Sequence, residues 1–295
     1  MKREERTLIF SFLALPVAIY ALFVLVPYGA AMVVAFTRWR ALSANITFNG
    51  LNNFIKLYRD EQFWQALSHN GIALIVLPAA TLALALFFAF LFTQGIRMAR
   101  LFRIIFFFPQ VLSAVVVAVL WGFIYHPTVG LLNAFFELIG IDALANFTWL
   151  GDPKTVFGSI LVVVIWQSVG FYMVLFVSGM EGIPNEYYEA ARLDGAAGWT
   201  LFANITVPLL WETIRTALVF VAIGAMDLFA IVTVMTNGTG GPSQAADVVP
   251  VLLYRTAFTN GEFGYAAAIG VALLLIILGL SFLSLRVTQR ETIQY

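Results

Sequence analysis

The sequence predicts an all-α, polytopic membrane protein with about six transmembrane helices and a polar helical hairpin between two of them. Of its 295 residues, 61% are hydrophobic and 11% are charged, whereas about one quarter of the residues in soluble proteins are charged. Long apolar runs recur along the whole chain at lengths near the roughly 20 residues that cross a bilayer. Residues 181–208 are the polar exception, with helix start and stop signals.

The first predicted span, residues 8–36, follows a basic N-terminus. It is much longer than the about 7–15 residues of a signal-peptide core, so we expect an uncleaved membrane helix. Pro16 and Pro27 predict kinks within it. In the polar segment that follows, Asp60 is a candidate N-cap for a short interfacial helix over residues 60–67.

Five more apolar runs predict the remaining spans, and shorter runs at 131–141 and 248–254 predict pieces that do not cross the bilayer. The five spans are residues 71–92, 104–125, 155–180, 216–235 and 264–285.

Six spans place both termini on the same side of the membrane. If that side is cytoplasmic, ten of the 16 Lys and Arg residues lie in inner segments and six in outer ones, as the positive-inside rule requires. The cluster formed by Arg97, Arg100 and Arg103 gives the clearest signal. The inner residues are Lys2, Arg3, Arg6, Arg97, Arg100, Arg103, Arg192, Arg215, Arg286 and Arg290.

The polar segment 181–208 predicts two short helices. Pro184 suits a first helical turn, and Gly195 can take the left-handed conformation that ends a helix. A second helix is expected over 198–203, ending before Pro208 because a proline disfavours helix at the residue that precedes it. The first helix would offer a face to a partner, made of Tyr187, Ala190 and Ala191.

The spacing within this hairpin resembles the EAA signature of permease subunits in binding-protein-dependent ABC importers, with Val207 where leucine is usual. The resemblance implies a coupling helix that inserts into a cytoplasmic ATPase subunit, with Glu189 and Gly195 at its centre. The residues that carry it are Glu189, Ala190, Ala191, Asp194, Gly195, Ile205 and Pro208.

Other segments resemble the carbohydrate-uptake branch of this family, and the maltose-permease F and glycerol-phosphate-permease A partners in particular. They are residues 50–54, Phe108-Pro109 with Trp121, residues 130–133 and residues 236–242. The resemblance implies three kinds of partner besides the lipid bilayer: a cytoplasmic ATPase dimer that binds ATP and Mg²⁺, a second homologous permease, and an extracytoplasmic solute-binding protein. It also implies the cytoplasmic membrane of a bacterium or archaeon, with both termini cytoplasmic.

The chemistry of an enzyme is missing from the sequence. No lysine follows a glycine, so there is no G-x-x-x-x-G-K-[ST] phosphate loop and the nucleotide must bind another chain. His69 and His126 lack the spacing of a metal site, and no G-x-S-x-G nucleophile motif occurs. With 16 basic and 16 acidic residues, a nucleic-acid partner held by net charge is not indicated.

Candidates for a substrate path lie in the fourth and fifth spans. Asp227 is the only acid deep in a predicted span, where an unpaired charge costs roughly 2.5–3.5 kcal/mol. Asp227 and Gln167 offer hydrogen bonds, and Trp166 and Tyr172 offer flat faces, as a neutral sugar requires. A hydrogen bond between spans and ordinary helix packing explain these residues equally well.

Together these observations predict one half of a heterodimeric channel that moves a monosaccharide, oligosaccharide or polyol by alternating access. A glycerol-phosphate-like substrate is the alternative within the family. An ion-coupled secondary transporter could use Asp227, but one lone acid and the lack of paired broken helices in the sequence disfavour it. A structural or assembly protein would leave the EAA-like spacing unexplained.

Overall fold

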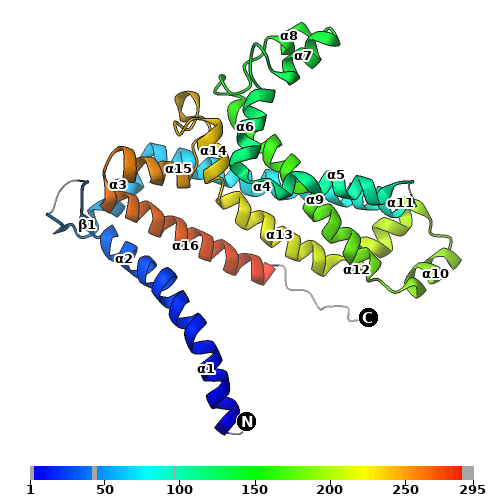
Figure 1. Ribbon diagram of the computed structural model, residues 1–295, viewed down its shortest axis with the longest axis horizontal. Coiled ribbons are helices and arrows are strands. Elements are labelled where there is room, and N and C mark those ends of the chain that lie inside the picture. Colours follow the sequence, from blue (N-terminus) through cyan, green and yellow to red (C-terminus); the bar gives the residue numbers. More distant parts are fainter. Residues whose placement is uncertain (1–2, 42–44, 96, 288–295) are drawn as a thin grey trace. The chain divides into compact units, whose positions relative to one another are not determined.

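The computed structural model describes residues 3–41, 45–95 and 97–287, which are almost entirely helical (Figure 1). Among the described residues, the strands are a two-residue antiparallel pair, β1 (Thr37–Arg38) with β2 (Thr47–Phe48), and turns and loops connect the helices. The all-α prediction is therefore confirmed apart from this short turn. Lys2 and Arg290, counted above among the inner basic residues, lie outside the described residues.

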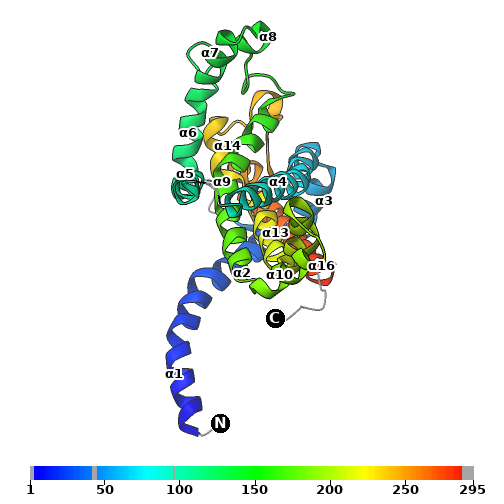
Figure 2. The same ribbon diagram turned by 90° about the vertical axis from the view of Figure 1, so that its right-hand side faces the viewer.

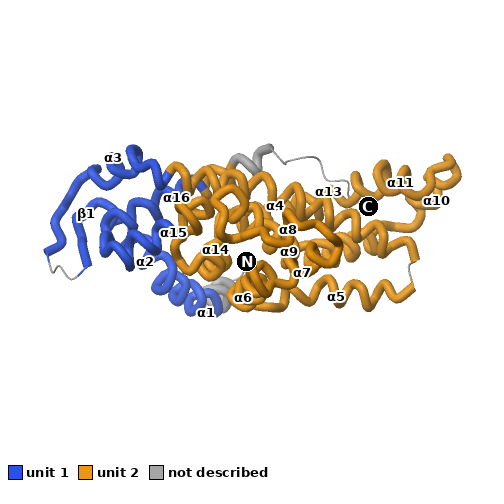
Figure 3. The backbone as a smooth tube through the Cα atoms, turned by 90° about the horizontal axis from the view of Figure 1, so that it is seen from above, with its two compact units in different colours: residues 1–63, 252–276 blue, residues 64–251, 277–295 orange. Residues whose placement is uncertain are grey.

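The chain divides into two compact units (Figure 3): residues 1–63 with 252–276, and residues 64–251 with 277–295. The elements of the first unit are α1 (Arg3–Tyr20), η1 (Ala21–Leu25), α2 (Val26–Ala35), β1, β2, α3 (Asn52–Arg59) and η4 (Arg255–Thr259). Three helices pass from one unit into the other, and they are α4 (Glu61–Thr93), α15 (Val249–Tyr254) and α16 (Phe263–Val287).

The second unit holds most of the helices. They are α5 (Ala99–Val111), α6 (Ala114–Ile124), α7 (Leu131–Leu138), α8 (Asp142–Ala145), α9 (Val156–Glu181), α10 (Asn185–Leu193), α11 (Gly198–Leu201), η2 (Phe202–Thr206), α12 (Val207–Leu209), α13 (Trp211–Met226), α14 (Phe229–Met235) and η3 (Pro242–Gln244).

The two prolines of the first span lie within helices, and the expected interfacial helix needs correction. Helix α1 continues through Pro16, and a π-helical turn, η1, precedes Pro27 in α2. Asp60 caps a helix as expected, since its Oδ1 accepts from the Gln62 N–H at 3.0 Å. That helix is α4, however, which runs on to Thr93 without a break. Residues 60–67 are thus the beginning of the second span rather than a separate interfacial helix.

The described part of the chain has four helices long and apolar enough to cross a membrane, or up to six if each of two bent pairs is one span. The third predicted span, 104–125, is not one helix, because α5 and α6 meet at 102°. The second bent pair joins Gly198–Leu209 to Trp211–Met226 at 72°. The fifth predicted span, 216–235, is therefore divided between two helices, because α13 ends at Met226 and α14 starts at Phe229. Six spans, as the sequence predicts, are the upper limit for the described residues, and neither the third nor the fifth predicted span is one continuous helix.

Close helix packing holds the second unit together. Helix α5 runs along α9, and α6 lies beside α14 in both views (Figures 1 and 2). At Gly170 of α9, an added Cβ would lie 1.7 Å from the Phe106 carbonyl oxygen of α5. Because no side chain fits in that space, only glycine allows these two backbones to approach so closely.

Candidate functional site

The predicted hairpin is present between α9 and α13. Its first helix, α10, begins directly after Pro184. The helix ends where Gly195 takes the left-handed conformation, with φ of +83°. The Ala196 N–H donates to the Ala191 carbonyl at 2.9 Å across this turn, which satisfies an orphan carbonyl of the last helical turn. The predicted helix stop at Gly195 is therefore confirmed.

Helix α10 presents a mixed apolar and acidic face to its surroundings. Leu193 is 90% exposed, and Tyr187 is also exposed, as are Ala190 and Glu189. Ala191 instead packs inward at 8% exposure. The prediction that Tyr187, Ala190 and Ala191 share an exposed face is therefore wrong for Ala191. Glu189, Ala190 and Leu193 are all available to a partner chain.

The second arm of the hairpin is longer than the sequence suggested. Helix α11 continues through the π-helical turn η2 and α12 to Leu209, so the helix does not stop before Pro208. In the π turn the Val207 N–H donates to the Phe202 carbonyl, five residues back. This wider turn leaves Pro208 in the first positions of α12, where a missing N–H is tolerated. Ile205 is half-buried, and Pro208 is exposed.

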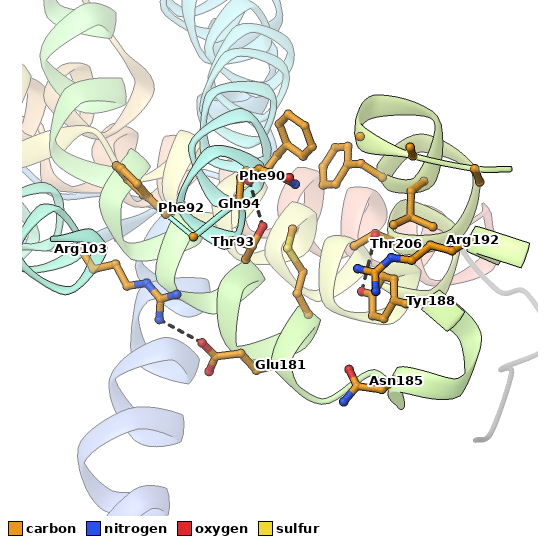
Figure 4. A pocket seen from close by; sticks show the side chains of 17 residues that line it. Phe90, Phe92, Thr93, Gln94, Arg103, Glu181, Asn185, Tyr188, Arg192 and Thr206 are labelled. Atoms are coloured by element: carbon orange, nitrogen blue, oxygen red, sulfur yellow. Dashed lines mark hydrogen bonds and ion pairs between the residues drawn. The ribbon is translucent and has the colours of Figure 1, made fainter. Parts of the chain in front are cut away.

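Behind the hairpin lies a pocket of about 560 Å³, which we call the hairpin pocket (Figure 4). Its walls come from the end of α4, from α5, from the end of α9 and from both arms of the hairpin. Across one side, the Arg103 Nη1 donates to the Glu181 Oε1 at 3.0 Å. On the other side, Tyr188 of α10 and Thr206 of η2 are joined by a hydrogen bond of 3.5 Å.

The first helix break, between α5 and α6, is bonded to α9. Leu112 is extended there, and its carbonyl accepts from the Gln167 Nε2 at 3.1 Å. Ser113 caps α6 by accepting from the Val116 N–H at 3.4 Å. Gln167 thus bonds the backbone of the third span, and not Asp227, which was its predicted partner.

The second break, between α13 and α14, is less enclosed. Asp227 occupies it with non-helical backbone angles, and its side chain is exposed on this chain. Its carboxylate has no hydrogen bond or ion pair with the described residues. Asp227 and Gln167 therefore share no hydrogen bond among the described residues, and the predicted bond between the fourth and fifth spans through this pair is not formed there.

The aromatic candidates on α9 have different surroundings. Trp166 is 38% exposed and packs edge-to-face on Trp121 of α6, with ring centroids 5.4 Å apart. Tyr172 is buried, and its ring meets that of Phe171 at 5.1 Å. Trp166 therefore remains accessible from outside this chain, whereas Tyr172 serves packing.

Sequence reasoning missed Asn70, which is fully buried. Its Nδ2 donates to the Ala225 carbonyl at 3.2 Å, and its Oδ1 accepts from the Val249 N–H at 2.9 Å. Next to it, the His69 Nδ1 lies 2.7 Å from the Asp247 carbonyl oxygen. An amide within an apolar helix is a signal for interhelical bonding. The signal was lost because the predicted span began one residue later, at Gly71.

Known proteins resemble this chain over most of its length. Residues 81–292 match the family described as "Binding-protein-dependent transport system inner membrane component". The diacetylchitobiose uptake system permease protein NgcF of Streptomyces coelicolor is 37% identical over 297 residues, covering 97% of this chain and 84% of that protein. The lactose transport system permease protein LacF of Rhizobium radiobacter is 30% identical over 92% of this chain and 91% of that protein.

The xylose/arabinose import permease protein XacH of Haloferax volcanii is 31% identical, over 85% of this chain and 78% of that protein. Among solved structures, a chain of a bacterial ABC transporter for import of the acidic polysaccharide alginate has a TM-score of 0.78 and 24% identity. The match covers 97% of this chain and 98% of that one. At this identity, the likeness establishes the fold.

Proposed function

We propose that this chain, which belongs to the family of inner membrane components of binding-protein-dependent ABC transporters, imports a neutral saccharide or polyol as one half of a heterodimeric channel. It is a multi-pass cytoplasmic membrane protein of the carbohydrate-uptake type, and a transport component rather than a catalytic chain. The relatives above are named for diacetylchitobiose, lactose and xylose or arabinose, which supports a saccharide substrate here.

The observation that carries the proposal is the exposed face of α10, which lies within the EAA-like spacing. Glu189, Ala190 and Leu193 project from a helix whose end is fixed by Gly195. We assign this surface to the cytoplasmic ATPase dimer, which would hold ATP and Mg²⁺. Asp194, Ile205 and Pro208 complete the coupling element, with Ala191 as its buried support. A second permease and an extracytoplasmic binding protein complete the transporter.

The hairpin is connected so that its movement reaches the helix breaks. Helix α9 ends only a few residues before α10 and carries Gln167, which bonds the α5–α6 break. On the other side, α12 leads into α13, which ends at Asp227. Differential binding of ATP by the ATPase subunits would move the hairpin, and these helices would switch the channel between inward-open and outward-open states.

Substrate contacts are assigned to the exposed groups near the breaks. We propose that Asp227 and Trp166 contact the substrate. Gln167 would contact it as well while its side chain bonds the Leu112 carbonyl. Tyr172 would support these residues by packing behind them. A phosphorylated substrate would need a cation at this depth. The nearest cation along the fifth span, Arg215, pairs with Glu212 in the first turn of α13. A neutral substrate therefore fits this half of the channel better than glycerol phosphate.

A lack of broken helices does not argue against an ion-coupled secondary transporter, because α5 and α6 meet at 102° and α13 is separated from α14 at Asp227. Membership of the binding-protein-dependent family argues against it instead. Co-purification tests the difference. We expect an ATPase to be recovered with the chain and uptake to require it, whereas uptake by the chain alone would support the secondary carrier.

Coupling is tested in the assembled complex with Glu189→Lys and Gly195→Val. We expect both variants to reach the membrane and to lose the stimulation of ATPase activity by loaded binding protein. Normal stimulation in both would contradict the coupling assignment. Competition of uptake by neutral sugars, polyols and glycerol phosphate tests the substrate class, and inhibition by glycerol phosphate alone would contradict a neutral substrate.

Orientation is tested with single cysteines, since the native chain has none. An impermeant thiol reagent should label Ala145→Cys from outside and Ala196→Cys only after the membrane is opened. The reverse pattern would contradict cytoplasmic placement of the hairpin and of both termini.

A further inference from the structure

The hairpin pocket contains two arginines with unused hydrogen-bond donors. The Arg103 Nε is buried and has no partner among the described residues, although its Nη1 pairs with Glu181. Arg192 lines the same pocket, and its guanidinium has no hydrogen-bond or ion-pair partner in the described part of the chain. Arg103 and Arg192 carry two positive charges and Glu181 of the lining carries one negative charge, so these three side chains have a net charge of +1. Such donors suit the oxygens of a phosphate.

Aromatic side chains form part of the pocket lining. The rings of Phe90 and Phe202 are tilted against one another with centroids 4.8 Å apart, and Phe92 also belongs to the lining. Figure 4 shows Arg103 and Arg192 on opposite sides of the space, with Phe92 near Arg103 and Phe90 above and between the two arginines. A ligand that fits this arrangement has both a phosphate and an apolar portion.

The pocket also lies where membrane helices end. Its walls include Thr93 at the end of α4 and Glu181 at the end of α9. The nearby first turns of α5 expose apolar side chains, with Ile104 at 59% and Ile105 at 54%. If the hairpin is cytoplasmic, as the proposed function requires, the hairpin pocket lies at the inner edge of the bilayer.

We propose that the hairpin pocket binds the headgroup phosphate of an anionic phospholipid from the cytoplasmic leaflet. Arg103 and Arg192 donate to the phosphate oxygens, and the phenylalanines contact the glycerol and upper acyl region. A pocket of about 560 Å³ falls within the usual size of small-molecule sites. A lipid held there ties α5 to α10 and makes the hairpin sensitive to membrane composition. A soluble phosphate ester shares the polar chemistry but does not use the phenylalanines of the lining.

The test uses the assembled transporter in nanodiscs of phosphatidylcholine with or without phosphatidylglycerol, and native mass spectrometry counts the retained lipids. We expect phosphatidylglycerol to be retained over phosphatidylcholine. Arg103→Gln and Arg192→Gln should each weaken this retention about fivefold, as expected from about 1 kcal/mol per basic residue. Arg97→Gln removes a charge at the same edge but outside the pocket lining, and it should leave retention unchanged.

Glu181→Gln separates lipid binding from misfolding, since it removes the ion pair but keeps both arginines. Retention should then persist or rise, and a loss equal to that of Arg103→Gln would overturn the proposal. Equal retention of both lipids, or equal loss in Arg97→Gln, would also overturn it. Arginine-dependent binding of inorganic phosphate with no retained phosphatidylglycerol would overturn the lipid source. Substrate-stimulated ATPase activity in the same discs shows whether the import function holds independently of the lipid.

Discussion

The two helix breaks of the second unit differ in how their polar groups are satisfied. At the α5–α6 break, Gln167 bonds the Leu112 carbonyl and Ser113 caps the next helix. At the α13–α14 break, the backbone before it is held by Asn70, but the Asp227 carboxylate remains exposed. A polar group buried without a partner is costly in a membrane. The first break is therefore complete within this chain, whereas the second offers a charge to something outside it.

The largest effect on this comparison is expected from Gly170→Ala. The added Cβ would overlap the Phe106 carbonyl and push α5 away from α9, at a cost of about 3 kcal/mol. Gly158 of the same helix has no atom within 4 Å of an added Cβ, so Gly158→Ala is the matched control. Thermal stability of the purified complex and its membrane abundance should fall in the first variant only. Equal values would show that α5 does not depend on this packing.

Asn70→Leu should have the next largest effect. It leaves the Ala225 carbonyl and the Val249 N–H without their buried partner, which costs about 2–3 kcal/mol. Hydrogen exchange of α13 measures the result, and we expect faster exchange near Ala225. Unchanged exchange would mean that the α13–α14 break is supported elsewhere. Asn52→Leu, at an exposed asparagine of α3, provides the control.

Gln167→Leu should cost about 1 kcal/mol, since it removes the single bond to Leu112. Denaturation in detergent should show a modest loss of stability together with altered uptake. Gln167→Glu retains an acceptor but not the donated bond, and it should be no more stable than Gln167→Leu. Wild-type stability in both variants would make the α5–α6 break independent of α9.

The smallest effect on stability is expected from Asp227→Asn, because this carboxylate makes no bond within the described residues. Sugar uptake by the assembled transporter should nevertheless fall about tenfold, as expected for a lost hydrogen bond to a charged group. Reduced stability with normal uptake would reverse the assignment and make Asp227 structural. That outcome would also remove the difference between the two breaks.

The features predicted correctly from the sequence depend on local chemistry. Hydropathy predicts where the spans lie because a span needs a long apolar run, which can be read directly from the sequence. Gly195 predicts the end of α10 because few other residues adopt positive φ. The breaks were missed since both lie inside apolar runs, where composition does not report continuity. Asp227 marked the second break by its charge, but a charge does not reveal backbone geometry.

The contacts of the candidate site depend on tertiary structure. Gln167 bonds a carbonyl 55 residues away in sequence, and spacing along one helix gives no information about that partner. The prediction that the second helix stops before Pro208 was wrong for a related reason. The rule that helices stop before proline assumes regular α-helical turns, and the π turn η2 removes that condition.

The π turn also affects how the number of residues in the second arm sets the rotation of that arm about its axis. An α-helix turns by about 100° for each residue, and η2 contains the wider turn before α12. A deletion of one residue within η2 would restore regular α-helix with little rotation of α11, because the wide turn already holds one extra residue. The same deletion within α11 would instead rotate the start of the arm by about 100° about its axis. The place of a deletion between Gly195 and Pro208 therefore decides whether the arm only shortens or also turns the residues that join it to α10.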